Sequence, residues 1–169
     1  MSFEHIVILK NDAVGDLVQS LPAIENITSG SENKKITVFL SERSKNFSFL
    51  LEKKNVEIKI VHYDLKLSEK IKILTYLIVN KINKIYILSP KNFYFFLPPV
   101  FRKIKFYGLC VDNVNNYKRP GAFLRKFLYK YIINHRDRVK RKSSKDLQIE
   151  LTSAENRNES KINYNKFLK

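Results

Sequence analysis

The sequence contains few residues of the types that build disulfide frameworks, thiolate–metal sites or phosphate-binding loops. Its 169 residues include one cysteine, no tryptophan and four glycines. The single cysteine, Cys110, excludes a disulfide framework and any zinc site that needs several thiolates. No segment approaches the roughly 18 uninterrupted apolar residues of a spanning helix. The N-terminus has no basic region followed by a small-residue cleavage site, so no secretory signal is expected and a cytoplasmic location is the default.

Acidic residues are also scarce. There are 16 Asp and Glu against 32 Lys and Arg, which gives a formal net charge of +16. The 44% of hydrophobic residues nevertheless argues against a disordered polycation, because it is enough to form one core. The excess charge is local: Lys118–Lys145 holds eleven cations and one acid, Asp137. The length fits one domain of ordinary size.

Five short apolar runs predict β-strands buried on both faces of a sheet. They are His5–Leu9, Lys35–Leu40, Val56–Val61, Lys84–Leu88 and Ile104–Leu109. Between them, apolar residues at helical spacing predict helices around Leu17–Ile27 and Leu67–Ile82. Pro22 inside the first of these predicts a kink, or a new start capped by Ser20. The alternation of strands and helices predicts an α/β fold, a Rossmann-like doubly wound parallel sheet.

The C-terminal part of the chain has a different character. Residues 120–134 carry an aromatic and aliphatic stripe and are expected to form an amphipathic helix. That helix either packs on the sheet with solvated lysines, or lies on an anionic membrane surface. Nucleic acid is not an expected partner, because no recognised binding motif accompanies the charge. We expect a Rossmann-like domain over residues 1–135 and a basic, polar, poorly ordered tail over residues 136–169.

The loop that follows the first predicted strand is the best candidate for a functional site. It reads Lys10-Asn11-Asp12-Ala13-Val14-Gly15-Asp16 and leads directly into the first helix. Its one glycine does not match the dinucleotide or nucleoside-triphosphate loop patterns. Asp16 at the helix start either caps the helix or acts as a hydrogen-bond acceptor or general base, since the helix dipole favours its ionised form.

The segment Ile6–Ile24 resembles the opening of glycosyltransferase family 9, the lipopolysaccharide heptosyltransferases. That opening is a hydrophobic strand, a Lys or Arg, small or polar residues, Gly-Asp, a hydrophobic pair and Leu-Pro-Ala. Lys10, Gly15-Asp16, Leu17-Val18 and Leu21-Pro22-Ala23 fall in register with it. A weaker echo occurs where Tyr107-Gly108 is followed by a polar loop and Arg119-Pro120.

The resemblance implies the N-terminal, acceptor-side half of a GT-B enzyme that catalyses metal-independent, inverting sugar transfer. It implies that Asp16 is the general base, and that Lys10, Asn11, Gly15 and Arg119 lie on the acceptor side. The implied acceptor is lipopolysaccharide core or a related anionic glycan, and peripheral contact with an anionic membrane is a further expectation.

Members of that family are about twice as long as this chain, and their second domain binds the nucleotide-sugar donor. The resemblance covers the first domain only. We therefore expect the donor, an ADP-heptose-like molecule, to bind a domain that this chain lacks, and we expect negligible transfer by the chain alone. No cofactor or metal is expected. The alternative, from another class, is a non-catalytic Rossmann-like module that binds an anionic membrane or glycan through its basic face.

Three further features are interpreted as structural. The stretch Phe93–Phe101 is expected to be a core helix ended by its prolines, with an acceptor-facing or membrane-facing surface as the alternative. His5 and His62 border predicted strands and have no Ser or Cys partner at a suggestive spacing. Cys110 follows a predicted strand and is expected to be a small buried residue.

Overall fold

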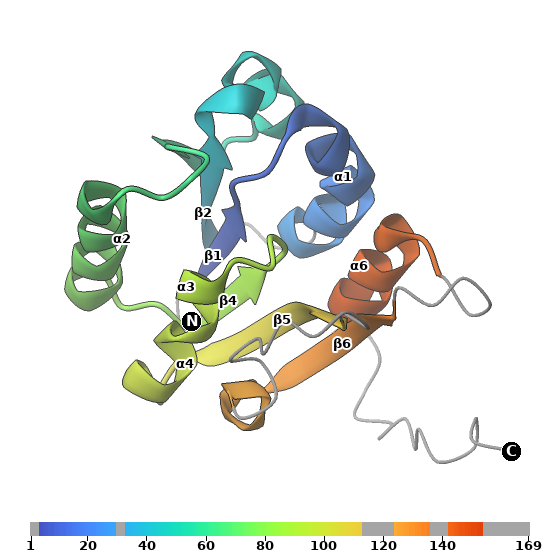
Figure 1. The fold of residues 1–169 in the computed structure, drawn as a ribbon. Coiled ribbons are helices and arrows are strands. Elements are labelled where there is room, and N and C mark those ends of the chain that lie inside the picture. The colour runs from blue at the N-terminus through green and yellow to red at the C-terminus, as the bar shows by residue number, and fades with distance from the viewer. Residues whose placement is uncertain (1–3, 30–32, 113–123, 136–141, 154–169) are drawn as a thin grey trace, which may run out of the picture.

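The computed structural model describes residues 4–29, 33–112, 124–135 and 142–153 and contains a parallel sheet (Figure 1). The six strands lie in the order β3-β2-β1-β4-β5-β6, and every pairing is parallel. Their bounds are Glu4–Lys10 (β1), Lys34–Ser41 (β2), Val56–Val61 (β3), Lys84–Ile87 (β4), Lys105–Asp112 (β5) and Lys130–His135 (β6). The predicted Rossmann-like doubly wound fold is therefore confirmed.

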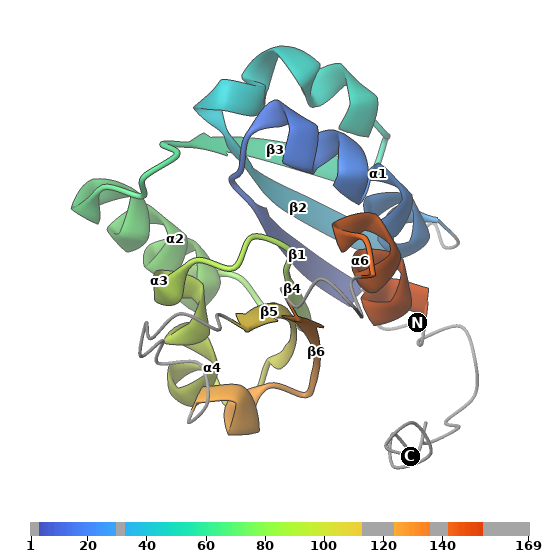
Figure 2. The ribbon, with the colours of Figure 1, turned by 45° about the vertical axis from the view of Figure 1, so that its right-hand side comes forward.

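Helices cover both faces of the sheet (Figure 2). One face carries α1 (Val14–Thr28), the 3-10 segment η1 (Glu42–Leu51) and α6 (Ser144–Ser153). The other carries α2 (Leu67–Val79), α3 (Asn92–Phe95), α4 (Leu97–Val100) and the 3-10 turn η2 (Arg125–Phe127). Strand residues alternate between the two cores: Val7 and Leu9 face α2, while Ile6 and Ile8 face α1. This period of two explains why β1 reads as one continuous apolar run.

Helix α1 runs without interruption through Pro22, and Ser20 does not cap a new helix. The Ser20 hydroxyl instead donates to the backbone carbonyl of Asp16 at 2.7 Å, one turn earlier, and Ser20 is fully buried. Of the two outcomes expected at Pro22, the structure therefore excludes the restart.

Residues 130–135 form strand β6, so the prediction of a helix over residues 120–134 is wrong there. The apolar residues Leu128 and Ile132 fit a helical spacing, but Lys130–His135 also alternates, with Tyr131 exposed and Ile132 buried. The free edge of β5 decides the outcome, because it supplies backbone partners from Tyr107 onward. Residues 118–123 of this basic segment lie outside the described residues.

Gly108 on β5 lies where Leu128, just before β6, packs closely against the strand, so there is little room for a side chain. A Cβ at this position would lie 3.0 Å from Leu128 Cδ1 and 3.4 Å from the Phe95 ring. A larger residue would push apart the layers on this face, since packed interiors leave little free volume.

Helix α6 lies within the region expected to be a polar tail, yet it packs on the sheet. Leu151 is fully buried and Leu147 nearly so, and both join the core on the α1 face. Asn26 on α1 donates to the Thr152 hydroxyl at 3.4 Å. The expectation of little to bury is therefore wrong for residues 144–153. Residues 136–141 and 154–169 lie outside the described part of the chain.

The aromatic stretch after β4 forms two short helices instead of one. Tyr94, Phe95 and Leu97 are buried, as expected of a core segment, while Phe96 and Val100 are exposed. Pro98 and Pro99 lie in the first turn of α4, where a missing backbone N–H costs little, so they do not end a helix. None of the helices in the described ranges combines the length and hydropathy needed to cross a bilayer.

Candidate functional site

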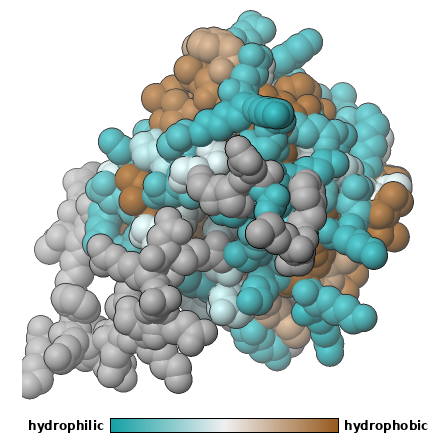
Figure 3. Space-filling model, turned by 180° about the vertical axis from the view of Figure 1, so that it is seen from behind, coloured by the Kyte–Doolittle hydropathy of each residue, from teal (hydrophilic) through white to brown (hydrophobic). Residues whose placement is uncertain are grey.

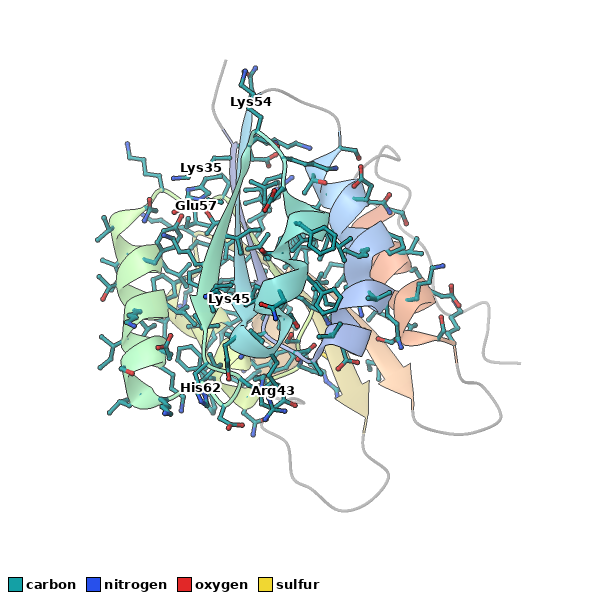
Figure 4. The ribbon with its side chains drawn as sticks, turned by 90° about the horizontal axis from the view of Figure 1, so that it is seen from above. Lys35, Arg43, Lys45, Lys54, Glu57 and His62 are labelled. Atoms are coloured by element: carbon teal, nitrogen blue, oxygen red, sulfur yellow. The ribbon has the colours of Figure 1, made fainter. Side chains whose placement is uncertain are left out.

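The loops at the carboxyl edge of the sheet form the candidate site. The strand order reverses between the parallel neighbours β1 and β4: β2 and β3, which follow β1 in sequence, lie on one side of this pair, and β5 and β6, which follow β4, lie on the other. In sheets of this kind, ligands bind beyond the carboxyl ends of the strands at that reversal. The predicted loop Lys10–Asp16 leaves β1 at this point. Figure 4 shows Arg43 and His62 together at this edge, with Lys35 and Glu57 toward the opposite one.

Lys10 is buried inside the loop that it begins. Its side chain is 1% exposed, and Nζ lies 2.7 Å from Oδ2 of Asp12. The backbone carbonyl of Asp12 in turn accepts a 2.9 Å hydrogen bond from the buried Ser44 hydroxyl. The ion pair neutralises the buried ammonium, and Ser44 ties the loop to the end of β2. Removing one partner of a buried pair leaves an uncompensated charge, so Lys10 and Asp12 depend on each other.

Asn11 is fully buried and joins three elements. The Tyr94 hydroxyl of α3 donates to Asn11 Oδ1 at 2.8 Å, and Asn11 Nδ2 donates to the Tyr63 carbonyl at 3.1 Å. Burial, with the negative charge of Asp12 adding to it, raises the pKa of Tyr94, so its hydroxyl remains a donor. Asn11 therefore fixes the loop after β3 and the start of α3 relative to β1.

Gly15 and Asp16 form the exposed part of the loop, in the first turn of α1. The N-cap of α1 is Ala13, so Asp16 does not occupy the capping position. No hydrogen bond or ion pair joins the Asp16 carboxylate to another residue in the described ranges. A Cβ at Gly15 would meet no atom within 4 Å. The carboxylate and the space beside Gly15 are both open to a ligand.

The loop after β3 adds an aromatic residue held between two cations. The Tyr63 ring has the Arg43 guanidinium 3.8 Å from its centroid and Lys91 Nζ 3.9 Å away. Lys91 Nζ also donates to the Tyr63 carbonyl at 2.5 Å. The three residues follow β2, β3 and β4, so they meet only when the sheet forms. Sequence analysis missed them, although each lies two to four residues beyond a strand end, where sites of this fold are built.

Charges of both signs surround Lys91. Burial lowers the pKa of its ammonium and Arg43 adds to this, while the carboxylates of Asp12 and Asp64 act in the opposite direction. His62 accepts from the Asp64 backbone N–H through Nδ1, and its Nε2 lies 3.7 Å from Glu42. A ligand at this edge would thus meet the cations Arg43 and Lys91, whose positive charge the nearby carboxylates partly offset.

Leu65 shows that the loop after β3 is constrained. It has a φ of 50°, a left-handed conformation that costs a non-glycine residue about 1–2 kcal/mol. The buried Leu65 side chain and a 3.1 Å bond from its N–H to the His62 carbonyl hold this conformation. The tight turn carries Tyr63 back toward Asn11.

The structure thus brings four of the five predicted site residues into one loop. Lys10 and Asn11 are internal, and Gly15 and Asp16 are exposed. Arg119 lies outside the described residues. His5 is buried near the amino end of β1. Cys110 is buried in β5, in the core on the α2 face, and burial raises the pKa of its thiol. Within the residues that the structure describes, no group of three His, Cys, Asp or Glu side chains could hold a metal ion.

The fold of this chain is similar to that of several solved glycosyltransferase structures. The heptosyltransferase WaaC of E. coli, solved with ADP, has a TM-score of 0.56 at 15% identity over 89% of this chain and 46% of its own. The same enzyme with ADP-2-deoxy-2-fluoro heptose has a TM-score of 0.59 at 15% identity, over 89% and 47% of the two chains.

A family 9 glycosyl transferase from Veillonella parvula DSM 2008 has a TM-score of 0.59 at 17% identity, over 90% of this chain and 42% of its own. No family model matches the sequence, and no curated protein matches it significantly. Identities this low establish the fold alone. The chain has the fold of glycosyltransferase structures that include a heptosyltransferase, and it spans less than half of their length.

Proposed function

We propose that this chain is the acceptor-side unit of a heptosyltransferase-like glycosyltransferase. Its acceptor is the lipopolysaccharide core or a related anionic surface glycan, and its donor is a nucleotide-activated sugar of the ADP-heptose kind. The observation that carries the proposal is the open Gly15–Asp16 pair where the strand order reverses. The fold similarity to glycosyltransferases supports it.

In this proposal Asp16 acts as the general base. Its carboxylate takes the proton of the acceptor hydroxyl while that oxygen attacks the anomeric carbon of the donor. The bond from that carbon to the nucleotide breaks on the opposite face, and the configuration inverts. Within the described ranges no side chain forms a hydrogen bond or ion pair with this carboxylate. It is therefore available to an acceptor at the start of α1.

The other loop residues support this step in two ways. Arg43 and Lys91, held against Tyr63, present cations to phosphates or acidic sugars of the acceptor. Lys10 and Asn11 act from inside the domain, because their polar atoms are bonded to Asp12, Tyr63 and Tyr94. Gly15 leaves the approach to Asp16 free. Arg119 stays an acceptor-side residue of the proposal by resemblance alone.

The test is sugar transfer by the full chain fused to the donor-binding half of a family 9 glycosyltransferase. Asp16→Asn should lower the transfer rate by about 10²–10⁴-fold, the usual contribution of a general base. Glu25→Gln is the matched control, since it removes one negative charge from the far end of the same helix, where Glu25 pairs with Lys53. It should transfer like the parent fusion.

Two outcomes would count against the proposal. Transfer that survives Asp16→Asn in an active fusion would remove the catalytic assignment. It would favour the alternative, a non-catalytic module that binds an anionic membrane or glycan through its basic surface. Turnover of a nucleotide-activated heptose by the unfused chain would contradict the assignment of donor binding to a separate domain.

A further inference from the structure

Contacts with the sheet fix the rotation of helix α2 about its own axis. Ile73 and Leu77 are buried against the sheet. The Tyr76 hydroxyl lies 2.7 Å from the Thr37 hydroxyl of β2, and its ring packs edge-on against Phe39 at 5.4 Å. These contacts hold one face of α2 against the sheet, so the opposite face cannot turn inward.

That opposite face carries large aliphatic side chains. Four large aliphatic side chains on it are more than half exposed: Leu67 (72%), Ile71 (54%), Ile78 (71%) and Val79 (75%). The first three recur at positions i, i+4 and i+11, which places them along one line of an α-helix. Figure 4 shows α2 side chains projecting away from the sheet, and Figure 3 shows brown side chains among teal at the edge where α2 lies. A grouped apolar surface of this kind marks an interaction site more often than scattered residues do.

Lysines flank the apolar line. Residues 66–81 contain four of them, Lys66, Lys70, Lys72 and Lys81, and one acid, Glu69. Lys66 and Lys81 are exposed beyond the two ends of α2. Lys72 lies 3.3 Å from Glu69 and is 70% exposed, while Lys70 lies 5.8 Å from the Phe93 ring centroid. The helix thus presents aliphatic side chains between positive charges.

We propose that the outer face of α2 docks on an anionic lipid bilayer. The aliphatic side chains would enter the interfacial region while the lysine stems extend to the headgroups, as amphipathic surface helices do. The charge pattern fits anionic lipid, because each cation near such a surface contributes about 1 kcal/mol. A second copy of this chain fits poorly, since two equally basic faces would repel each other.

The position of α2 relates this surface to the candidate site. Leu67 begins the helix five residues after His62, so the first turn of α2 lies at the carboxyl edge that carries Tyr63 and Lys91. A bilayer against α2 would therefore lie beside the edge that receives the acceptor. This second point rests on the proposed function, whereas the docking surface itself does not.

Co-sedimentation of the full chain with vesicles tests the docking surface. Vesicles of phosphatidylcholine with 30 mol% phosphatidylglycerol, about one anionic lipid in three, should pellet the chain at low salt, and pure phosphatidylcholine should not. The double variant Ile71→Ser with Ile78→Ser should reduce the partition coefficient tenfold or more, because both side chains leave water on docking. Both residues are exposed, so circular dichroism should show an unchanged fold.

The matched control is Phe49→Ser with Leu50→Ser. These side chains are also exposed and apolar, but they lie on η1, over the opposite face of the sheet. The control should pellet like the parent chain. Equal pelleting of the α2 variant, or no binding to anionic vesicles, would overturn the proposal. So would sedimentation velocity that shows a dimer abolished by the α2 variant. Asp16→Asn should pellet normally, which separates failure of docking from failure of the proposed function.

Discussion

At the residue scale, the loop after β1 divides its polar residues between support and exposure. Lys10 and Asn11 are buried and bonded inside the domain, while Gly15 and Asp16 face solvent. A contiguous run of seven residues thus contains both the exposed carboxylate and the groups that fix its loop. Substitutions at the buried positions should therefore affect stability, whereas substitutions at the exposed positions should affect ligand binding or catalysis.

Gly15→Ala should separate stability from function. The methyl group meets no atom within 4 Å in the folded chain, and alanine is the better helix former. The free energy of unfolding should therefore rise by about 0.4–1 kcal/mol, measured by chemical denaturation. Sugar transfer by the fused chain should nevertheless fall, because the methyl group occupies the approach to Asp16. Undiminished transfer would show that the acceptor does not use this space.

His5 should make stability depend on pH. Its Nε2 lies 3.1 Å from the Thr37 hydroxyl and 3.3 Å from that of Tyr76. Burial lowers the pKa of His5 below 6.5, and Lys35 adds to this. In the unfolded chain His5 binds a proton as the pH falls through about 6.5, while the native residue binds one only at lower pH. The free energy of unfolding should therefore be greatest above that pH and decline below it.

His5→Gln removes this linkage, because glutamine does not titrate. Denaturation of both proteins between pH 7.5 and 5, the range about the ordinary pKa of histidine, should show a smaller decline for the variant. Parallel pH profiles of the two proteins would mean that His5 binds its proton equally well in the folded and unfolded states.

At the element scale, α6 and α2 differ in what they contribute to folding. Leu151 of α6 is fully buried in the core over α1, whereas Leu67 of α2 is 72% exposed. Leu151→Ala should lower the free energy of unfolding by about 2–5 kcal/mol, and Leu67→Ala should change it by less than about 1 kcal/mol. Chemical denaturation of the two variants measures this difference. Similar values for the two would mean that α6 does not belong to the folded unit.

Sequence patterns predicted the strands from β1 to β5, the edge strand β3 included, and missed the two C-terminal elements β6 and α6. The runs that became β1, β2 and β4 are almost continuously apolar, as is typical of a buried parallel strand. Leu128 and Ile132 fit a helix or a strand equally well, and the free edge of β5 selected the strand. Helix α6 buries only a few apolar side chains, so its pattern was too weak to predict a packed element.

The candidate site could be predicted only where it is contiguous. Gly15 and Asp16 lie in one loop and could be recognised from the sequence alone. Arg43, Tyr63 and Lys91 come from three different strand ends, and only the sheet order brings the two cations within 4 Å of the Tyr63 ring centroid. No spacing along the chain encodes that arrangement.

At the scale of the whole molecule, the two edges of the sheet differ in what they offer a ligand. The carboxyl edge carries the open loop and the cations around Tyr63, where the strand order reverses. At the opposite end Lys35 and Lys59 pair with Glu57, and hydrogen bonding from Lys59 lowers the pKa of that carboxyl. A net charge of +16 attracts any anionic glycan, so binding alone does not identify the site, whereas the position of binding does.

An NMR titration of the isotope-labelled chain with deacylated, phosphorylated lipopolysaccharide inner-core oligosaccharide therefore tests whether the acceptor binds at the carboxyl edge. We predict saturable amide shifts in the loops after β1, β2, β3 and β4, around Asp16, Arg43, Tyr63 and Lys91. A dephosphorylated oligosaccharide should bind more weakly. Shifts confined to the opposite edge, around Lys35 and Glu57, or no saturable binding would contradict the assignment of this edge as the acceptor site.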